Sequence, residues 1–275
     1  MGLTIALGLA SAVCWGAPDV WLAQATRRIG PLAVVFGSLL IGLVVIAPAA
    51  AFVDPPDWTT RGVLLAIGVG VLSALAYWIA FHAFRFGSVS VVAPIIACEG
   101  GVAAVLAIAA GEDLSGLVIV FLPIAVLGVV LAAMGRGGGK AAVLPAVAAA
   151  LVWGAILVLT SPVADDLGVY WGFLLIRVSA LAFSVPFTVM AGDATAWVRD
   201  PWRVAAWGLG DSAAYLLFVA AADRGPVAVA SVLAAQFATV AVVAGMLSGE
   251  RPLVRQRIGI ALVIVAVTGI AAAGA

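Results

Sequence analysis

Four charged side chains lie far inside long apolar stretches of this sequence: Asp19, Glu99, Arg177 and Asp211. Moving one such group to the middle of a bilayer costs roughly 2.5–3.5 kcal/mol even on lenient insertion scales. Proteins that keep charges at this depth use them to bind substrates or ions, to relay protons, or to pair with one another. We therefore expect these residues to mark a functional site. Arg177 either holds a substrate carboxylate or, as we favour, forms a structural ion pair with one of the acids.

Aromatic rings accompany the acids at the spacing of a helix. In the stretch 202–222, Trp207, Asp211, Tyr215 and Phe218 follow one another at steps of four, four and three residues, which places them on one helical face. Aromatic faces attract cations through the ring quadrupole, and a carboxylate neutralises the charge of a cation. This face therefore favours a site for an ammonium group, although aromatic stripes also occur as ordinary packing in helical bundles.

Other stretches add residues to the expected site. Trp15 and Asp19 lie one helical turn apart, and so do Tyr77 and Phe81. Gln236 is a neutral amide that can donate a hydrogen bond to a substrate. The candidate substrate-binding residues are Trp15, Asp19, Tyr77, Phe81, Glu99, Trp153, Trp207, Asp211, Tyr215 and Gln236.

Glu99 is the first candidate for proton coupling. It is followed by Gly100 and Gly101, where a neighbouring backbone can approach closely. A carboxyl group in surroundings of low dielectric is more easily protonated near neutral pH. We predict that Glu99 carries a coupling proton, with Asp19 as the second candidate.

The composition places these residues in a membrane protein. Of the 275 residues, 65% are hydrophobic and 9% are charged, and the formal net charge is zero. Such a chain has too little polar surface to cover a water-soluble globule. About 20 apolar residues cross the hydrocarbon layer as a helix. We therefore expect an all-α membrane protein surrounded by lipid, without a nucleic-acid partner.

Charged residues and Gly- or Pro-containing turns divide the chain into ten apolar segments. We expect transmembrane helices at residues 3–25, 31–52, 61–84, 88–110, 114–134, 141–163, 169–192, 202–222, 226–247 and 254–274. The turns are short, and no phosphate-binding loop is present, so an ATP-driven pump is disfavoured. Prolines inside the segments predict bends, at Pro18, Pro48, Pro94 and Pro186.

The chain repeats itself at an offset of 138 residues, the distance from Trp15 to Trp153. The same offset pairs Gly30 with Gly168, Pro48 with Pro186, Tyr77 with Tyr215, Gly87 with Gly225, and Glu112 with Glu250. Each copy holds five segments, an odd number, so the second copy enters the membrane from the opposite side. We predict two five-helix repeats of inverted topology, at residues 1–137 and 138–275, a plan that places a substrate site near the bilayer midplane.

The offset separates scaffold from site. It pairs Asp19 with Leu157, Glu99 with Phe237, Asp211 with Ser73, and Arg177 with Leu39. None of the four buried charges is therefore required by the architecture, because the other half builds the same helix without it. Glu112 and Glu250 recur where we expect a fifth segment to begin, so we predict that they cap helix N-termini.

Each half contains a Trp-Gly pair in its first segment, a glycine turn before its fourth, and a Gly-Glu pair before an apolar fifth. With these features given twice, the chain resembles the EamA type of the drug/metabolite transporter superfamily over essentially its whole length. The resemblance implies a ten-helix carrier that moves a small metabolite by alternating access, through a cavity lined mainly by segments 1, 3, 4, 6, 8 and 9. Charged residues at mid-membrane depart from the usual pattern of this family and leave the substrate open.

Basic residues predict the orientation. Ten of the 13 Lys and Arg lie in the turns after segments 1, 3, 5, 7 and 9, while only Arg61 and Arg224 lie at the opposite face. The positive-inside rule then places both termini outside the cytoplasm, in an inner or plasma membrane.

We therefore expect a secondary active transporter for a small cationic or zwitterionic metabolite, such as an amino acid or a choline-like amine, with proton coupling or exchange. The first alternative is a facilitative or efflux carrier that uses Arg177 for an anionic or neutral metabolite. A membrane enzyme and a non-transporting scaffold are less favoured. An enzyme acting on a lipid-linked substrate would need clustered acids and histidines, whereas His82 is the single histidine. No cofactor or metal is expected, and the oligomeric state stays open, a monomer included.

Overall fold

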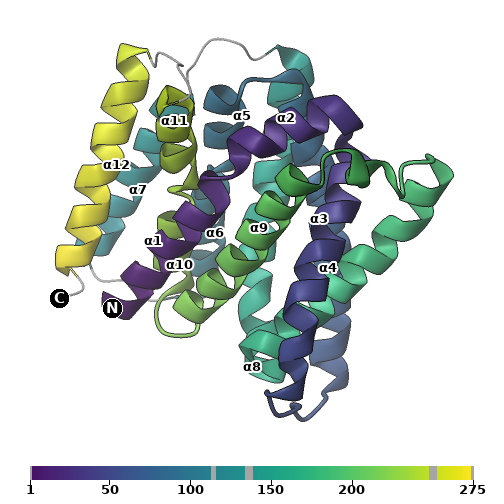
Figure 1. Ribbon diagram of the computed structural model, residues 1–275. Coiled ribbons are helices and arrows are strands. Elements are labelled where there is room, and N and C mark those ends of the chain that lie inside the picture. The colour runs from purple at the N-terminus through teal and green to yellow at the C-terminus, as the bar shows by residue number, and fades with distance from the viewer. Residues whose placement is uncertain (1, 113–115, 134–138, 248–252, 274–275) are drawn as a thin grey trace.

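The computed structural model describes residues 2–112, 116–133, 139–247 and 253–273, which form a bundle of helices (Figure 1). The helices are α1 (Gly2–Gly16), α2 (Asp19–Ile29), α3 (Pro31–Ile46), η1 (Ala47–Ala51), α4 (Thr60–Phe86), α5 (Val89–Ile96), α6 (Glu99–Ala109), α7 (Gly116–Ala133), α8 (Lys140–Met190), η2 (Ala196–Arg199), α9 (Pro201–Ala222), α10 (Val227–Ala234), α11 (Phe237–Leu247) and α12 (Val254–Ala273). Among the described residues, seven helical stretches are long and apolar enough to cross a membrane. The stretches 2–29 and 89–109 each count once, although each is broken near its middle.

The longest helix, α8, consists of two helices joined at a kink. Gly168 has φ 72° and ψ 158°, outside the helical region. Its partner at the 138-residue offset, Gly30, has φ 87° and ψ 155° and separates α2 from α3. Residues with a Cβ are strained in this conformation. At both positions, glycine lets the chain turn from one helix into the next, so the predicted boundary between residues 163 and 169 is present inside α8.

Two broken stretches repeat at the same offset. Helices α5 and α10 begin and end 138 residues apart, and so do α6 and α11. One break falls just before Glu99 and the other just before Phe237. The internal repeat seen in the sequence therefore extends to the secondary structure of these stretches, and the break forms with or without a carboxyl group after it.

A third break, between α1 and α2, has no counterpart in the other half. It falls at Pro18, which lacks a backbone N–H and cannot continue the hydrogen bonding of α1. The equivalent residue, Ile156, lies in the uninterrupted first part of α8. The break therefore follows from a proline that only the first half contains, and it places Asp19 at the start of α2.

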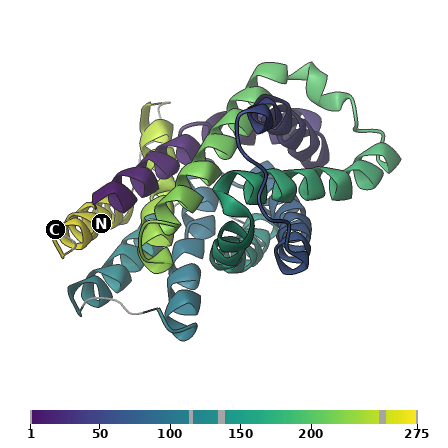
Figure 2. The same cartoon turned by 90° about the horizontal axis from the view of Figure 1, so that it is seen from below.

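Helices from the two halves of the chain interleave. Helix α1 packs against α9, α10 and α11, and α6 packs against α8. Helices α7 and α12 pack against each other on one side of the bundle, away from α3 and α4 (Figures 1 and 2). One hydrophobic core holds buried residues from both halves, among them Val34, Phe81, Ile156 and Phe218. The centre of the bundle is therefore built by both halves together.

Glu112 caps the N-terminus of α10, and not, as predicted from the sequence, the helix that follows it in the chain. Its carboxylate accepts hydrogen bonds from the backbone N–H groups of Val227 and, at 2.9 Å, Ala228, the first two residues of α10. A negative charge at this end compensates the dipole of α10 and satisfies two free N–H groups. The prediction had placed the cap on the segment that follows Glu112 in sequence. The equivalent residue, Glu250, lies outside the described residues.

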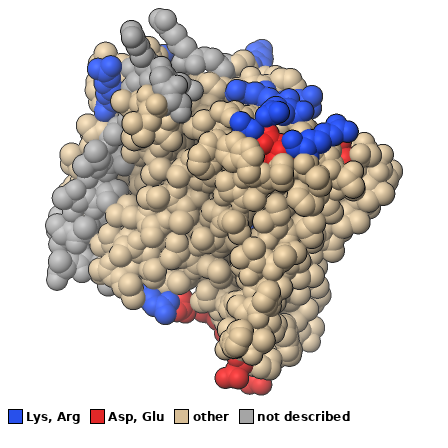
Figure 3. Space-filling view, viewed as in Figure 1, with Lys and Arg blue, Asp and Glu red and all other residues tan. Residues whose placement is uncertain are grey.

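Charged side chains gather at the two ends of the bundle. Figure 3 shows basic residues along the upper edge, above the end of α2 and the start of α9, and acidic residues toward the lower edge. Between them lies a broad band of uncharged surface. Large apolar side chains are exposed on the bundle, among them Val44, Leu64 and Leu151. An apolar band of this kind is the surface that lipid tails cover in a helical membrane protein.

Replacing Gly168 by alanine is expected to lower the free energy of unfolding by about 1–3 kcal/mol, because its backbone conformation is costly for any residue with a Cβ. Space is not the reason, since no neighbouring atom lies within 4 Å of a Cβ built there. Gly68→Ala is the matched control, because this glycine also faces open space but lies within α4. Thermal unfolding in detergent compares the variants, and equal stability of the two would contradict this explanation of the kink.

Candidate functional site

The three acids predicted to lie deep in the membrane, Asp19, Glu99 and Asp211, meet at one cavity in the centre of the bundle. Eight of the ten candidate residues line it, namely Trp15, Asp19, Tyr77, Phe81, Glu99, Trp153, Trp207 and Asp211. Leu22, Ala80, Phe84, Ile96 and Phe237 complete the lining. These residues come from α1, α2, α4, α5, α6, α8, α9 and α11, the parts of the chain that the family resemblance implied. The cavity has a volume of about 50 Å³, which is room for a few water molecules.

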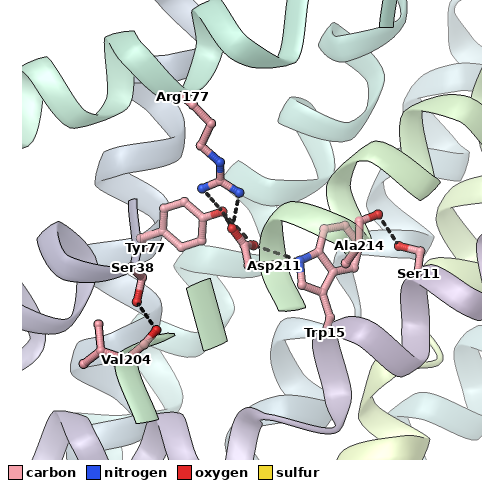
Figure 4. A network of polar contacts seen from close by, with 8 residues as sticks. All are labelled: Ser11, Trp15, Ser38, Tyr77, Arg177, Val204, Asp211 and Ala214. Carbon is pink, nitrogen blue, oxygen red and sulfur yellow. Dashed lines mark hydrogen bonds and ion pairs between the residues drawn. The ribbon is translucent and has the colours of Figure 1, made fainter. Parts of the chain in front are cut away.

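Asp211 is the most heavily bonded of the three acids (Figure 4). Arg177 forms an ion pair with its Oδ2 atom. The Tyr77 hydroxyl donates to Oδ1 at 2.8 Å, and the Trp15 indole N–H donates to the same oxygen at 2.9 Å. Both oxygens are therefore used, and a guanidinium balances the negative charge.

Arg177 is buried, with a side chain that is 4% exposed, and it is not among the residues that line the cavity. Its Nη1 atom also donates to the Tyr77 hydroxyl at 3.2 Å, and the guanidinium carbon lies 5.0 Å from the centre of the Phe173 ring. Arg177 could bind a substrate carboxylate or pair with an acid of the protein, and the observed contacts are those of an ion pair with Asp211.

Asp19 and Glu99 are bonded far less completely. Asp19 accepts one hydrogen bond, from the Trp207 indole N–H at 3.2 Å, while its Oδ2 atom is buried without a partner among the described residues. No side chain of the described residues forms a hydrogen bond or ion pair with the Glu99 carboxyl group. Both residues are nevertheless buried, at 4% and 5% exposure. These two carboxyl groups can therefore bind a cation or a proton without giving up an ion pair within the protein.

Helix ends compensate these two acids in place of side chains. Asp19 is the first residue of α2 and Glu99 is the first residue of α6. The N-terminus of a helix carries a partial positive charge and free N–H groups, which favour a negative charge nearby. The helix breaks described above therefore place both carboxyl groups at the cavity and lower the cost of their charge.

The two Trp-Gly pairs explain how tryptophan reaches the cavity wall from both halves. A Cβ at Gly16 would collide with the backbone carbonyl of Phe237, and a Cβ at Gly154 would lie 3.0 Å from the carbonyl oxygen of Glu99. In each case the glycine lets a helix lie directly against the helix break of the other half. The preceding residue, Trp15 or Trp153, then lines the cavity beside that break.

Two of the candidate residues do not reach the cavity. The Tyr215 ring packs against Phe173, with 5.0 Å between ring centres, and lines a separate small cavity. Gln236 lies in the break between α10 and α11, where its amide donates to the Val232 carbonyl of α10 at 2.8 Å, and its side chain borders another small cavity beside Cys98. A shared helical face did not place Tyr215 in the same hollow as Asp211. The guanidinium carbon of Arg177 lies 6.0 Å from the centre of the Tyr215 ring.

Phe84 and Phe237 line the cavity but were not among the candidates. The sequence held a signal for both. Phe84 follows Phe81 by three residues on the face that carries Tyr77, and Phe237 stands at the offset position of Glu99. The offset shows where the two halves differ, and it also identifies positions that face the same hollow, since Glu99 and Phe237 both line the cavity.

Comparison with known proteins gives a family and a fold. The model of the EamA-like transporter family matches the chain twice, at residues 2–134 and 140–272. A comparison with curated proteins finds no match. Among solved structures, 29 chains match. One of them, described only as a crystal structure of a protein, has a TM-score of 0.71 at 17% sequence identity and covers 97% of this chain and 96% of its own. At this identity the likeness concerns the fold alone.

Replacing Arg177 by glutamine is expected to lower the free energy of unfolding by about 3–5 kcal/mol, because the charge of Asp211 stays buried without its partner. The double variant Arg177→Gln, Asp211→Asn removes both charges and is expected to regain most of this loss. Arg61→Gln is the matched control. The Arg61 side chain is 67% exposed in its ion pair with Asp166, so its loss should cost about 1 kcal/mol or less.

Unfolding of the detergent-solubilised variants by heat or denaturant measures these differences. If Arg177→Gln proves as stable as Arg61→Gln, the Asp211 carboxylate does not depend on the guanidinium.

Proposed function

We propose that this chain, which belongs to the EamA-like transporter family, is a secondary transporter that moves a small organic cation or zwitterion by alternating access. The observation that carries the proposal is a central cavity at which Asp19 and Glu99 are buried but not paired with a basic residue. Keeping such groups in a membrane is costly, and a cationic ligand would supply the missing partner.

Aromatic rings around the acids support an ammonium ligand. Trp15, Trp153, Trp207, Phe81 and Phe237 all line the cavity. Edge-to-face contacts hold the rings in place; the Phe81 and Trp207 rings, for example, are 4.8 Å apart between centres with planes at 89°. A cation bound among such rings gains from their quadrupoles, and more so where water is excluded.

We infer ten membrane-spanning helices in two inverted halves, residues 1–137 and 138–275. The two parts of α8 on either side of Gly168, together with α7 and α12, bring the seven apolar stretches to ten. The equal bounds of α5 and α10 and of α6 and α11 support the division into halves, as do the equal conformations of Gly30 and Gly168. In such a plan the substrate site lies between the halves, where the acids meet.

Substrate entry requires the lining helices to move. A cavity of about 50 Å³ is much smaller than the pockets of a few hundred Å³ that hold small ligands. The helix breaks before Asp19, Glu99 and Phe237 are positions at which half-helices can tilt without stretching a regular hydrogen-bond ladder. We propose that tilting at these breaks opens the cavity to one side of the membrane or to the other.

Competition between a proton and the substrate gives a mechanism for exchange. The Asp19 Oδ2 atom and the Glu99 carboxyl group have no partners among the described side chains, so the same oxygens can hold either a proton or an ammonium group. Binding of one then displaces the other. We propose Glu99 as the coupling residue, with Asp19 as the second, because exchange requires both ligands to share a site.

The alternative of an anionic substrate bound by Arg177 has less support. It requires the guanidinium to leave Asp211 and Tyr77 and to enter a cavity that it does not line. The charge of Asp211 would then need another partner, and Asp19 and Glu99 would repel the anion.

Transport in proteoliposomes tests the proposal. A thermal-shift screen of the purified protein against amines, amino acids, nucleosides and sugar phosphates first identifies a ligand, and its uptake is then followed with and without a pH gradient. Glu99→Gln is expected to leave the protein folded and to abolish the dependence of transport on the gradient, because glutamine cannot exchange a proton. Asp223→Asn, at an exposed end of the bundle, is the matched control. Unchanged pH dependence in Glu99→Gln would exclude this residue from coupling.

The orientation is tested separately. Arg27 and Arg28 lie at the end of α2, and Arg203 lies near the start of α9. Figure 3 shows basic residues at this edge of the bundle, which the positive-inside rule assigns to the cytoplasm. A reporter fused to the C-terminus is expected to be active only if it functions outside the cytoplasm. Activity of a cytoplasm-specific reporter at this position would reverse the assignment.

A further inference from the structure

The described residues of the cavity wall offer no cation to a substrate carboxylate. The residues that line it include no lysine, arginine or histidine. Arg177 is the basic residue buried beside it; its Nη2 and Nη1 atoms are directed to Asp211 and Tyr77, and its Nε atom is buried without a partner among the described residues. A zwitterionic substrate such as an amino acid would therefore bring a carboxylate into a site that does not supply an opposite charge.

The neutral donors of the cavity wall are used as well. The Trp15 indole N–H and the Tyr77 hydroxyl both donate to Asp211, and the Trp207 indole N–H donates to Asp19. Among the lining side chains this leaves the Trp153 indole N–H, which bonds to no described side chain. One N–H group can donate a hydrogen bond to a hydroxyl oxygen of a substrate, but a carboxylate has about four acceptor positions to satisfy.

The helix N-termini at the cavity do not supply the donors that a substrate carboxylate would need. In transporters with broken helices, the N-terminus of a half-helix can receive the carboxylate of a substrate. Here α2 begins with Asp19 and α6 begins with Glu99, so a substrate carboxylate at either helix end would lie next to a carboxyl group of the protein. Phe237 begins α11, and the Trp15 ring packs against its ring, with 6.4 Å between centres.

Hydrogen-bond acceptors at the cavity, in contrast, outnumber the donors that the described side chains direct to them. Asp19 has a buried oxygen without a partner, and Glu99 forms no hydrogen bond with a described side chain. Arg177 balances the charge of Asp211. The cavity therefore holds up to two negative charges that only protons or a bound ligand can neutralise, and these charges would repel an anionic group next to them.

We propose that this site selects organic cations that carry no carboxylate, and that it discriminates against the amino acid from which such an amine differs only by that group. This inference rests on the proposed function and narrows its substrate class. Asp19 and Glu99 bind the ammonium group, aromatic rings surround it, and Asp211 remains paired with Arg177.

Matched pairs of ligands test the proposal on the full-length protein in detergent. Tyramine is compared with tyrosine, and choline with betaine, because the members of each pair differ at the carboxylate. Isothermal titration calorimetry measures the affinities. The amine of each pair is expected to bind at least about tenfold more tightly, since a carboxylate beside two like charges without a counter-ion costs more than one decade of affinity.

Variants show which acids make the selection. Asp19→Asn and Glu99→Gln are each expected to weaken the binding of tyramine at least about tenfold, because each removes a negative charge that faces the ligand. The double variant Arg177→Gln, Asp211→Asn is expected to keep the preference for tyramine over tyrosine, because it removes a pair without net charge. Asp223→Asn controls for loss of charge at a distant, exposed position.

The outcomes separate this inference from the proposed function. Tyrosine binding as tightly as tyramine, or betaine as tightly as choline, would overturn the inference but would still fit a carrier of zwitterions. Binding of sugar phosphates alone, with no response to any amine or amino acid, would overturn both. A loss of the preference in the double variant would show that Arg177 and Asp211 take part in selection, against the division of roles proposed here.

Discussion

Every ionised carboxylate held deep in an apolar bundle needs a compensating charge or dipole, and this chain meets that requirement in two different ways. Asp211 receives an ion pair from Arg177 and hydrogen bonds from Tyr77 and Trp15. Asp19 and Glu99 receive mainly the N-terminal dipole of a helix, which stabilises a charge by only about 0.3–2 kcal/mol. The first arrangement fixes helices in place, because breaking a buried pair is costly. The second leaves charge available to a ligand.

The repeated architecture supplies the hollow, and departures from the repeat supply the charge in it. The helix breaks before Glu99 and Phe237 are equivalent, and both residues line the cavity. The break before Asp19 falls at Pro18 and has no equivalent in the other half, where the helix continues through Ile156. Two similar halves can thus form a cavity to which only some positions contribute charge. The equivalent positions in the other half, such as Phe237 for Glu99, build the same helix without a charged side chain.

The sequence predicted the helical membrane fold and most of the cavity lining for one physical reason. Lipid does not tolerate unpaired charge or free backbone groups, so apolar length and buried acids are strong signals even in a single sequence. The partners of those acids were not predictable. Spacing along a helix gives a face, but it does not give the distance to the next helix, so Arg177 could not be assigned to Asp211 in advance and Tyr215 was placed in the wrong hollow. Glu112 shows the same limit, since the helix that it caps begins 115 residues later.

Infrared difference spectroscopy with a bound amine tests the central claim most directly, because it reports which carboxyl groups change when a cation binds. Addition of tyramine is expected to change carboxyl or carboxylate bands that disappear in Asp19→Asn and Glu99→Gln and that persist in the double variant Arg177→Gln, Asp211→Asn. Bands that persist in both single variants and vanish only with Asp211 would contradict the account, since the cation would then bind the acid that Arg177 was held to neutralise.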